Sequence, residues 1–170
     1  MANPNGDVGD VFLPDGRLRL DLLNDPAAAV MREAQRLAQQ TRWDRLRSPH
    51  VFMGLLAMPD AQVRNWGQRL GADLTALLEQ FRELFQQPEG DADAVLLHRE
   101  FLSDNVIRLL REACQRAAEQ HRSQITSMDL LISILTAPKS FVAGCFEHIG
   151  VTAAKLTEMA VMAEYHGDQS

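Results

Sequence analysis

The sequence has few cysteines and no recognisable metal-binding pattern. Its two cysteines, Cys114 and Cys145, form no CxxC pair, and each falls on an apolar helical stripe. The sequence therefore predicts two reduced core thiols without a disulfide framework. Cys145 precedes His148 by three residues on one predicted helix, but a zinc site needs further convergent ligands and the sequence offers no second cluster. We expect no metal and no cofactor.

Basic charge and long apolar runs are also scarce. With 17 Lys and Arg against 23 Asp and Glu, the net charge of −6 weighs against nucleic acid, whose phosphates need clustered cations. Residues 42–47 hold three arginines around Trp43; a solvated loop is the first interpretation and a phosphate contact the alternative. No run approaches the roughly 18 apolar residues that span a bilayer. Residues 1–9 lack the basic and apolar regions of a signal peptide, so we expect a cytoplasmic protein without a membrane partner.

What the sequence does contain is an internal repeat. Residues 23–79 align without a gap with residues 102–158, at a constant offset of 79. Thirteen of the 57 aligned pairs are identical: Leu23/Leu102, Asp25/Asp104, Arg32/Arg111, Glu33/Glu112, Ala34/Ala113, Ala38/Ala117, Ser48/Ser127, Leu56/Leu135, Pro59/Pro138, Val63/Val142, Gly71/Gly150, Leu77/Leu156 and Glu79/Glu158. These are mostly small, apolar or capping residues, so the duplication describes a scaffold and not a reaction centre.

Start and stop signals divide each repeat into four helices. In the first repeat Asn24 caps a helix that runs to about Thr41, and Ser48 caps a very apolar central helix. Pro59 breaks that helix, a third ends at Gly71, and a fourth begins near Asp73 and carries Leu74 to Phe85. The second repeat follows the same plan from Ser103, Ser127, Pro138 and Gly150, and its last helix runs to about Glu164.

The predicted fold is all-α, with eight helices in two four-helix repeats related by a pseudo-twofold axis. Each apolar central helix should pack against the first and fourth helices of its own repeat. We expect an extension over 1–21, a domain over 22–164 and a tail over 165–170. Within the domain, repeat one covers 22–86, the linker 87–100 and repeat two 101–164.

The extension contains two short extended runs around Pro14-Asp15-Gly16, a sequence that favours a tight turn. We predict a small β-hairpin over residues 11–20. Phe12, Leu13 and Leu22 either line a groove for a partner or pack the hairpin onto the body of the domain.

Catalysis has little support in the sequence. No G-x-x-x-x-G-K-[ST] phosphate loop occurs, so the chain cannot hydrolyse ATP by that mechanism. His50 begins the apolar helix and has Asp129 as its repeat mate, but no activated Ser or Cys accompanies it. We interpret His50 as a hydrogen-bonded structural residue and the chain as a non-enzyme. Trp66 should fill the core, whereas Trp43, flanked by charges, is the better exposed anchor.

The two central helices carry a resemblance to a known family. Residues 48–56 (SPHVFMGLL) precede Leu70-Gly71, and residues 127–135 (SMDLLISIL) precede Ile149-Gly150. A cap, a Ser/Thr-x-His-type start, an apolar helix and a later apolar-Gly, present twice in register, resemble the N-terminal domain of Clp unfoldases over residues 22–164. Such domains are docking modules that hand proteins to an AAA+ ring ATPase.

The resemblance implies protein partners: substrates, adaptors, AAA+ modules or, in the type VI secretion branch, a partner helix in an apolar groove. Some members bind phosphoarginine at the capped helix starts, which here are Asn24 and Ser103. The glutamates that meet the guanidinium are replaced by Pro49 and Met128, which speaks against that ligand. Candidate partner-binding residues are Phe12, Leu13, Leu22, Asn24, Trp43 and Ser103. The alternative function is a free-standing scaffold or regulator that binds one protein without an attached ATPase.

Overall fold

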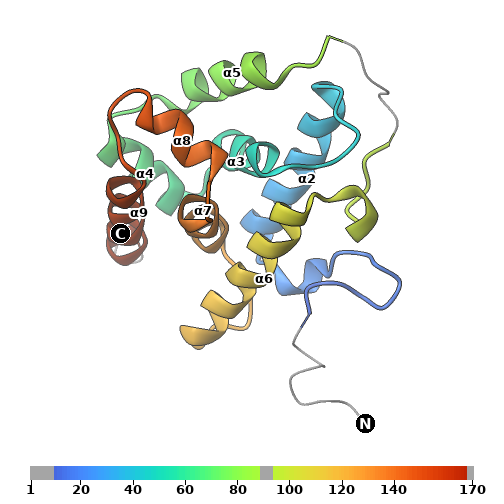
Figure 1. The fold of residues 1–170 in the computed structure, drawn as a ribbon. Helices are drawn as coiled ribbons and strands as arrows, with labels where there is room; N and C mark the ends of the chain where they lie inside the picture. Colours follow the sequence, from blue (N-terminus) through green and yellow to red (C-terminus); the bar gives the residue numbers. More distant parts are fainter. Residues whose placement is uncertain (1–9, 89–93, 168–170) are drawn as a thin grey trace.

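The computed structural model describes residues 10–88 and 94–167 and contains eight α-helices (Figure 1). Their bounds are α2 Asp25–Gln40, α3 Ser48–Ala57, α4 Ala61–Leu70, α5 Leu74–Phe85, α6 Asp104–Glu119, α7 Ser127–Thr136, α8 Phe141–Glu147 and α9 Ala153–Gly167. Short 3₁₀ turns, η1 Leu20–Leu22 and η2 Arg99–Phe101, precede α2 and α6. The predicted all-α class with two four-helix repeats is confirmed, and over the described ranges no segment forms a strand.

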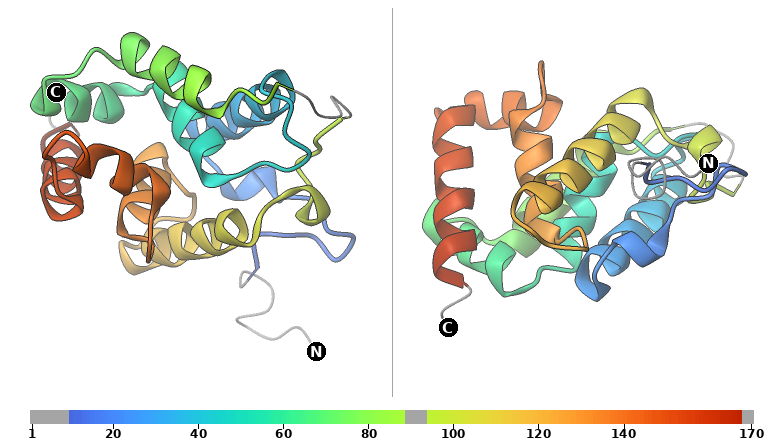
Figure 2. Two further views of the ribbon diagram at one scale, coloured as in Figure 1. Left: turned by 45° about the horizontal axis from the view of Figure 1, so that its top comes forward. Right: turned by 90° about the horizontal axis from the view of Figure 1, so that it is seen from below.

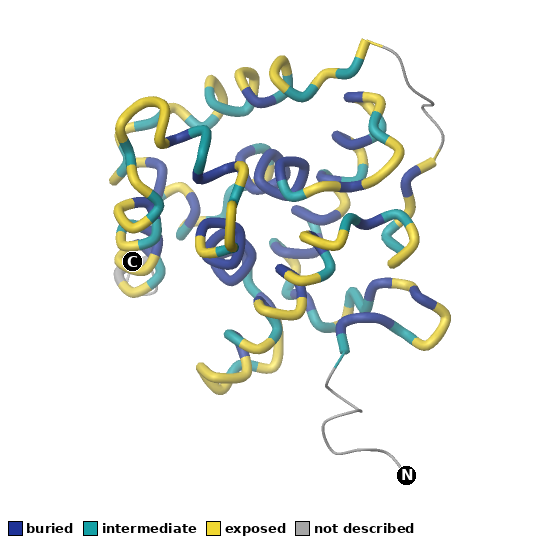
Figure 3. Tube along the Cα trace, viewed as in Figure 1, coloured by how far each residue is buried: buried dark blue, intermediate teal, exposed yellow. Residues whose placement is uncertain are grey.

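The two central helices form the core. Every residue of α7 from Ser127 to Leu135 is buried, as are all residues of α3 from Pro49 to Leu56 (Figure 3). As predicted, α3 packs against α2 and α5, and α7 against α6 and α9; the two central helices also touch each other. Gly54 permits the close crossing of α2 and α3, because a Cβ there would lie 2.6 Å from the carbonyl oxygen of Val30.

Helix caps agree with the sequence at the outer helices and differ at the central ones. Asn24 and Ser103 cap α2 and α6 as predicted. Ser48 and Ser127 are not caps; they are the first helical residues, and Arg47 and Thr126 occupy the cap positions. The reason lies in the third residue of each helix, which reaches back to the backbone in the manner of a capping box. In α3 the Arg47 N–H donates to His50 Nδ1 at 2.9 Å. In α7 the Thr126 N–H donates to Asp129 Oδ2 at 2.8 Å.

The two repeats are joined crosswise through their backbones. In one junction the N–H of Asn24 donates to the Ile125 carbonyl at 2.9 Å, and the N–H of Ile125 donates to the Leu22 carbonyl at 2.7 Å. The other junction is formed by the repeat mates of these residues. There the N–H of Ser103 donates to the Leu46 carbonyl at 3.0 Å, and the N–H of Leu46 donates to the Phe101 carbonyl at 2.8 Å. Because the same pairing occurs twice with the roles of the repeats exchanged, it supports the predicted pseudo-twofold relation.

The first helix of each repeat ends in a left-handed residue that is not glycine, Arg42 with φ 66° and His121 with φ 58°. The residue that follows donates its N–H back into the last turn, the six-to-one bond of a Schellman motif. These bonds run from Trp43 to the Ala38 carbonyl and from Arg122 to the Ala117 carbonyl, both at 2.9 Å. The motif therefore turns the Trp43 and Arg122 side chains toward the start of the central helix of their own repeat.

In the first repeat, the contact between Trp43 and the start of α3 involves no charged pair. The edge of Trp43 faces His50, with ring centroids 5.7 Å apart, and His50 Nε2 lies 3.2 Å from the Thr41 hydroxyl. His50 is fully buried, which confirms its predicted structural role. Burial, with a smaller contribution from the Arg47 charge, lowers the pKa of His50 to about 4, so the ring is neutral near pH 7.

In the second repeat the same place holds an ionic cluster. Asp129, fully buried, accepts hydrogen bonds from Arg116 at 2.8 Å and Arg122 at 2.6 Å, and Arg116 also binds Glu164 of α9 at 2.7 Å. Burial raises the pKa of the Asp129 carboxyl, but hydrogen bonds from Arg122, from the Thr126 backbone and from Arg116 outweigh it and hold the pKa below its ordinary value. The cluster ties α6, α7 and α9 together.

The extension forms a turn instead of the predicted hairpin. Phe12 and Leu18 make a single antiparallel bridge around Gly16, whose φ of 97° suits glycine. Backbone bonds of 2.8 Å, from the Leu13 N–H to the Arg17 carbonyl and from the Arg19 N–H to the Val11 carbonyl, flank this bridge, and the pairing stops there because the chain enters η1 at Leu20. Phe12 is buried, and its ring lies beneath the Arg99 and Arg111 guanidinium groups.

The predicted tail over 165–170 begins inside a helix, since α9 continues to Gly167 because no helix breaker precedes that glycine. Residues 1–9, 168–170 and the linker residues 89–93 lie outside the described residues. Within the described part, no single helix is long and apolar enough to cross a membrane, and only the bent α7–α8 pair meets that test by length and composition.

The ionic cluster should contribute measurably to stability. We expect Asp129→Asn to lower the free energy of unfolding by about 2 kcal/mol, because Arg116 and Arg122 lose a shared buried counter-charge while Glu164 remains. Chemical denaturation followed by circular dichroism measures the change. Glu79→Gln, which breaks an exposed pair with Arg82, is the matched control and should cost less than about 1 kcal/mol. Equal effects of the two substitutions would contradict the role of the cluster.

His50 should make the fold sensitive to mild acid. Its folded pKa of about 4 lies below the unfolded value of about 6.5, so between these values only the unfolded chain takes up the proton. The free energy of unfolding should therefore fall as the pH drops through this window, by up to roughly 3 kcal/mol. His50→Asn should flatten the dependence of the unfolding midpoint on pH over the same window, and an unchanged slope would count against the assignment.

Candidate functional site

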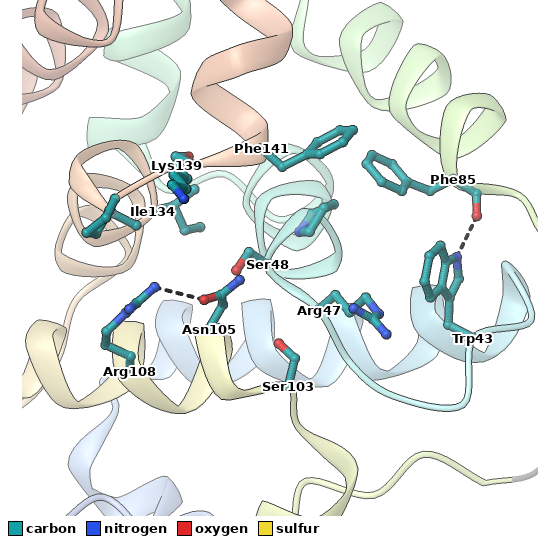
Figure 4. A pocket seen from close by; sticks show the side chains of 14 residues that line it. Trp43, Arg47, Ser48, Phe85, Ser103, Asn105, Arg108, Ile134, Lys139 and Phe141 are labelled. Carbon is teal, nitrogen blue, oxygen red and sulfur yellow. Dashed lines mark hydrogen bonds between the residues drawn. The ribbon is translucent and has the colours of Figure 1, made fainter.

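A cleft of about 250 Å³ opens between the starts of α3, α6 and α8 and the end of α5 (Figure 4). Both repeats contribute to it, because the crosswise junction at Leu46 places the start of α6 beside the start of α3. The lining residues are Trp43, Arg47, Ser48, Pro49, Phe85, Ser103, Asn105, Arg108, Ile134, Ala137, Pro138, Lys139, Ser140 and Phe141. We call this the open cleft.

One side of the open cleft is aromatic. Phe141 contacts Phe85 edge to face, with ring centroids 5.1 Å apart, and the ring centroids of Phe85 and Trp43 are 6.3 Å apart (Figure 4). The indole N–H of Trp43 donates to the Phe85 carbonyl at 2.6 Å, which fixes the end of α5 to the loop after α2. Phe85 also stacks on the buried Phe81 at 6.1 Å, so the wall continues into the core. Phe141 is 54% exposed and available for contact.

The other side is polar and cationic. Ser103, Asn105 and Arg108 of α6 lie across from the aromatic rings in Figure 4. The Arg47 guanidinium lies over the Trp43 ring at 5.0 Å, and Arg108 donates to Asn105 at 2.8 Å. Arg47, Arg108 and Lys139 make the site basic in an acidic protein, since none of the described residues that line it is an Asp or a Glu.

A second hollow lies at the position related by the pseudo-twofold, and its character is opposite. It is lined by Asn24, Asp60, Gln62, Gln120, Arg122, Thr126 and Glu164. At the offset of 79, six of these seven are repeat mates of open-cleft residues: Asn24/Ser103, Asp60/Lys139, Gln62/Phe141, Arg122/Trp43, Thr126/Arg47 and Glu164/Phe85. We call this the mate hollow.

The mate hollow has a volume of about 240 Å³, close to that of the open cleft, but two of its lining side chains are bonded within the chain. Its Arg122 is bound to Asp129, and Gln62 of α4 donates to the Glu164 backbone carbonyl at 3.1 Å. Helices α4 and α9 pack side by side, as both views of Figure 2 show. The two related sites therefore differ in chemistry: one has a polar lining with internal bonds, whereas the other presents an exposed phenylalanine and three cations.

The structure separates the six residues proposed from the sequence into three groups. Trp43 and Ser103 line the open cleft together, although they belong to different repeats. Asn24 lies in the mate hollow. Phe12 is buried and Leu13 and Leu22 are half-buried at the extension, which agrees for Phe12 with the packing alternative.

Sequence reasoning did not identify Phe85, Phe141, Arg108 or Lys139 as site residues. A usable signal existed in the repeat alignment: Phe141 stands opposite Gln62, Phe85 opposite Glu164 and Lys139 opposite Asp60. Exchanges of this kind, in which an apolar residue replaces a polar one or one charge replaces the other, mark positions at which the two repeats have different roles. Core positions such as Leu56 and Leu135 keep their type.

Comparison with known proteins rests on structure. No protein-family model matches the sequence, and no curated protein matches it. Among solved structures, the N-terminal domain of the caseinolytic protease associated chaperone ClpD from Arabidopsis thaliana aligns with a TM-score of 0.64 and 16% identity, over 84% of this chain and 94% of that one. The Hsp104 N-terminal domain from Candida albicans aligns with a TM-score of 0.66 and 14% identity, over 82% of this chain and 89% of that one.

A complex of the ClpV N-domain with a VipB peptide gives a TM-score of 0.63 and 19% identity, over 85% of this chain and 88% of that one. At these identities the likeness concerns the fold, and it extends over both repeats and most of the described chain. The duplication and its helix order thus lead to one conclusion: this chain has the double-repeat fold of Clp N-terminal domains.

Proposed function

We propose that the chain is a non-enzymatic protein-binding module of the Clp N-domain type, which recruits substrates or adaptors to an AAA+ unfoldase through the open cleft. The observation that carries the proposal is the difference between the two related sites. The mate hollow has nearly the same volume, but its lining is polar and its Arg122 and Gln62 side chains are bonded within the chain, whereas the open cleft keeps Phe141 more than half exposed beside Phe85 and Trp43. Aromatic side chains at a partly formed pocket are typical anchors of protein interfaces.

The comparisons support a polypeptide as the ligand. The ClpV N-domain has been solved with a VipB peptide, and the fold of that domain is the fold of this chain. A type VI secretion setting, with a partner helix as ligand, is one form of the proposal. The alternative is a free-standing scaffold or regulator that uses the same cleft for a single partner without an attached ATPase.

The cleft can be tested by peptide selection. A displayed library of short random peptides is selected on the immobilised chain, and the recovered peptides are titrated by fluorescence anisotropy. We expect Phe141→Ala to weaken their binding by about tenfold or more, because it removes an exposed anchor without opening the core.

Ile149→Ala is the matched control, since Ile149 is a more exposed apolar residue that does not line the cleft. It should leave affinity unchanged. If Phe141→Ala binds every recovered peptide as tightly as the wild type, the cleft is not the docking site.

The choice between unfoldase recruitment and the alternative needs the native context. Tagging the gene at its own locus, followed by purification and mass spectrometry, should recover an AAA+ unfoldase together with varied clients. A single partner without any unfoldase favours the free-standing regulator instead.

A further inference from the structure

Three cations, Arg47, Arg108 and Lys139, line the open cleft. Arg47 has its cation–π contact with Trp43, and Arg108 its hydrogen bond to Asn105. Across the described ranges, neither of these nor Lys139 forms a salt bridge with a carboxylate. Three positive charges around an apolar wall, in a chain of net charge −6, form a local field that favours an anionic ligand.

The mate hollow allows the charges of the two related sites to be compared within one chain. There the carboxylates come from the chain itself, through Asp60 and Glu164, and Glu164 binds Arg116. In the open cleft these two positions hold Lys139 and Phe85. At these two positions the open cleft thus holds a cation and a ring in place of two acids, and none of the described residues that line it supplies a carboxylate.

Helix α8 differs from its counterpart α4 in length and in its start. It has seven residues where its counterpart α4 has ten, and it starts one residue later in the repeat, at Phe141 instead of the mate of Ala61. Trp66 of α4 donates its indole N–H to the Leu156 carbonyl of α9 at 3.2 Å, but the repeat mate of Trp66 is Cys145.

The backbone holds Lys139 at the mouth of the cleft. Its φ of 54° is left-handed, a conformation that is unfavourable for a residue with a side chain. The repeat mate Asp60 has an ordinary φ of −81° and caps α4. In the second repeat Ser140 takes over the cap, which leaves Lys139 free to face the cleft.

From these observations we infer that the open cleft selects acidic segments of partner proteins. An apolar side chain of the segment packs on Phe85 and Phe141, and its Asp or Glu carboxylates face Arg47, Arg108 and Lys139. The inference rests on the proposed function, because it assumes that the cleft binds a polypeptide, and it adds the class of polypeptide.

The probe for this inference is the tightest peptide from the selection, compared with a copy in which every carboxylate is changed to the amide. The wild-type chain should bind the acidic peptide about tenfold more tightly than its amide copy, and added salt should reduce the difference. Arg47→Glu with Arg108→Glu should abolish this preference.

Arg32→Glu with Arg69→Glu is the matched control, because it changes the net charge equally at exposed positions outside the cleft. It should retain the preference. Lys139→Ala, at an exposed loop position, provides a milder variant in case the double substitution impairs folding, and it should reduce the preference in part.

Outcomes for the inference and for the proposed function are distinct. Equal affinity for the acidic peptide and its amide copy, or a selection that returns peptides without carboxylates, overturns the inference; the proposed function then stands if Phe141→Ala still weakens binding. If Phe141→Ala has no effect on either peptide, the proposed function fails and the inference fails with it.

Discussion

The arrangement of this protein depends on the crosswise backbone pairing of its two repeats. In each repeat the segment before the first helix pairs with a loop of the other repeat. Leu23 forms a bridge with Ile125, and Leu102 forms one with Leu46. The pairing sets the start of α6 beside the start of α3. Without it the open cleft would have no second wall, since most of its polar side belongs to one repeat and most of its aromatic side to the other.

Within this symmetric frame, the two copies have diverged at the positions that the crosswise pairing brings together. At the start of the central helix, one copy places Trp43 against a neutral His50, whereas the other places Arg122 against a charged Asp129. Both solutions satisfy a buried polar group, which is a requirement of the interior. The ionic solution draws α9 inward through Glu164, whereas the neutral one leaves α5 at the surface with only Phe81 buried.

Local chemistry made most of the fold predictable. Asn24, Ser103, Asp73, Gly71 and the two breaking prolines act on their own neighbours, so their effect can be read from short stretches of sequence. The caps of α3 and α7 were predicted one residue too late, because His50 and Asp129 act back along the chain. The site was only half predictable: Trp43 and Ser103 were named for separate reasons, but their shared cleft results from long-range pairing that no local pattern encodes.

Because the open cleft is built from both repeats, it exists only while they are docked together. A ligand that binds there interacts with the associated repeats and not with either one alone. By mass action, ligand binding must therefore favour their association, and the apparent stability of the whole chain becomes a function of ligand concentration. The crosswise junction thus couples occupancy of a surface site to the cohesion of the interior, although the ligand never touches the core.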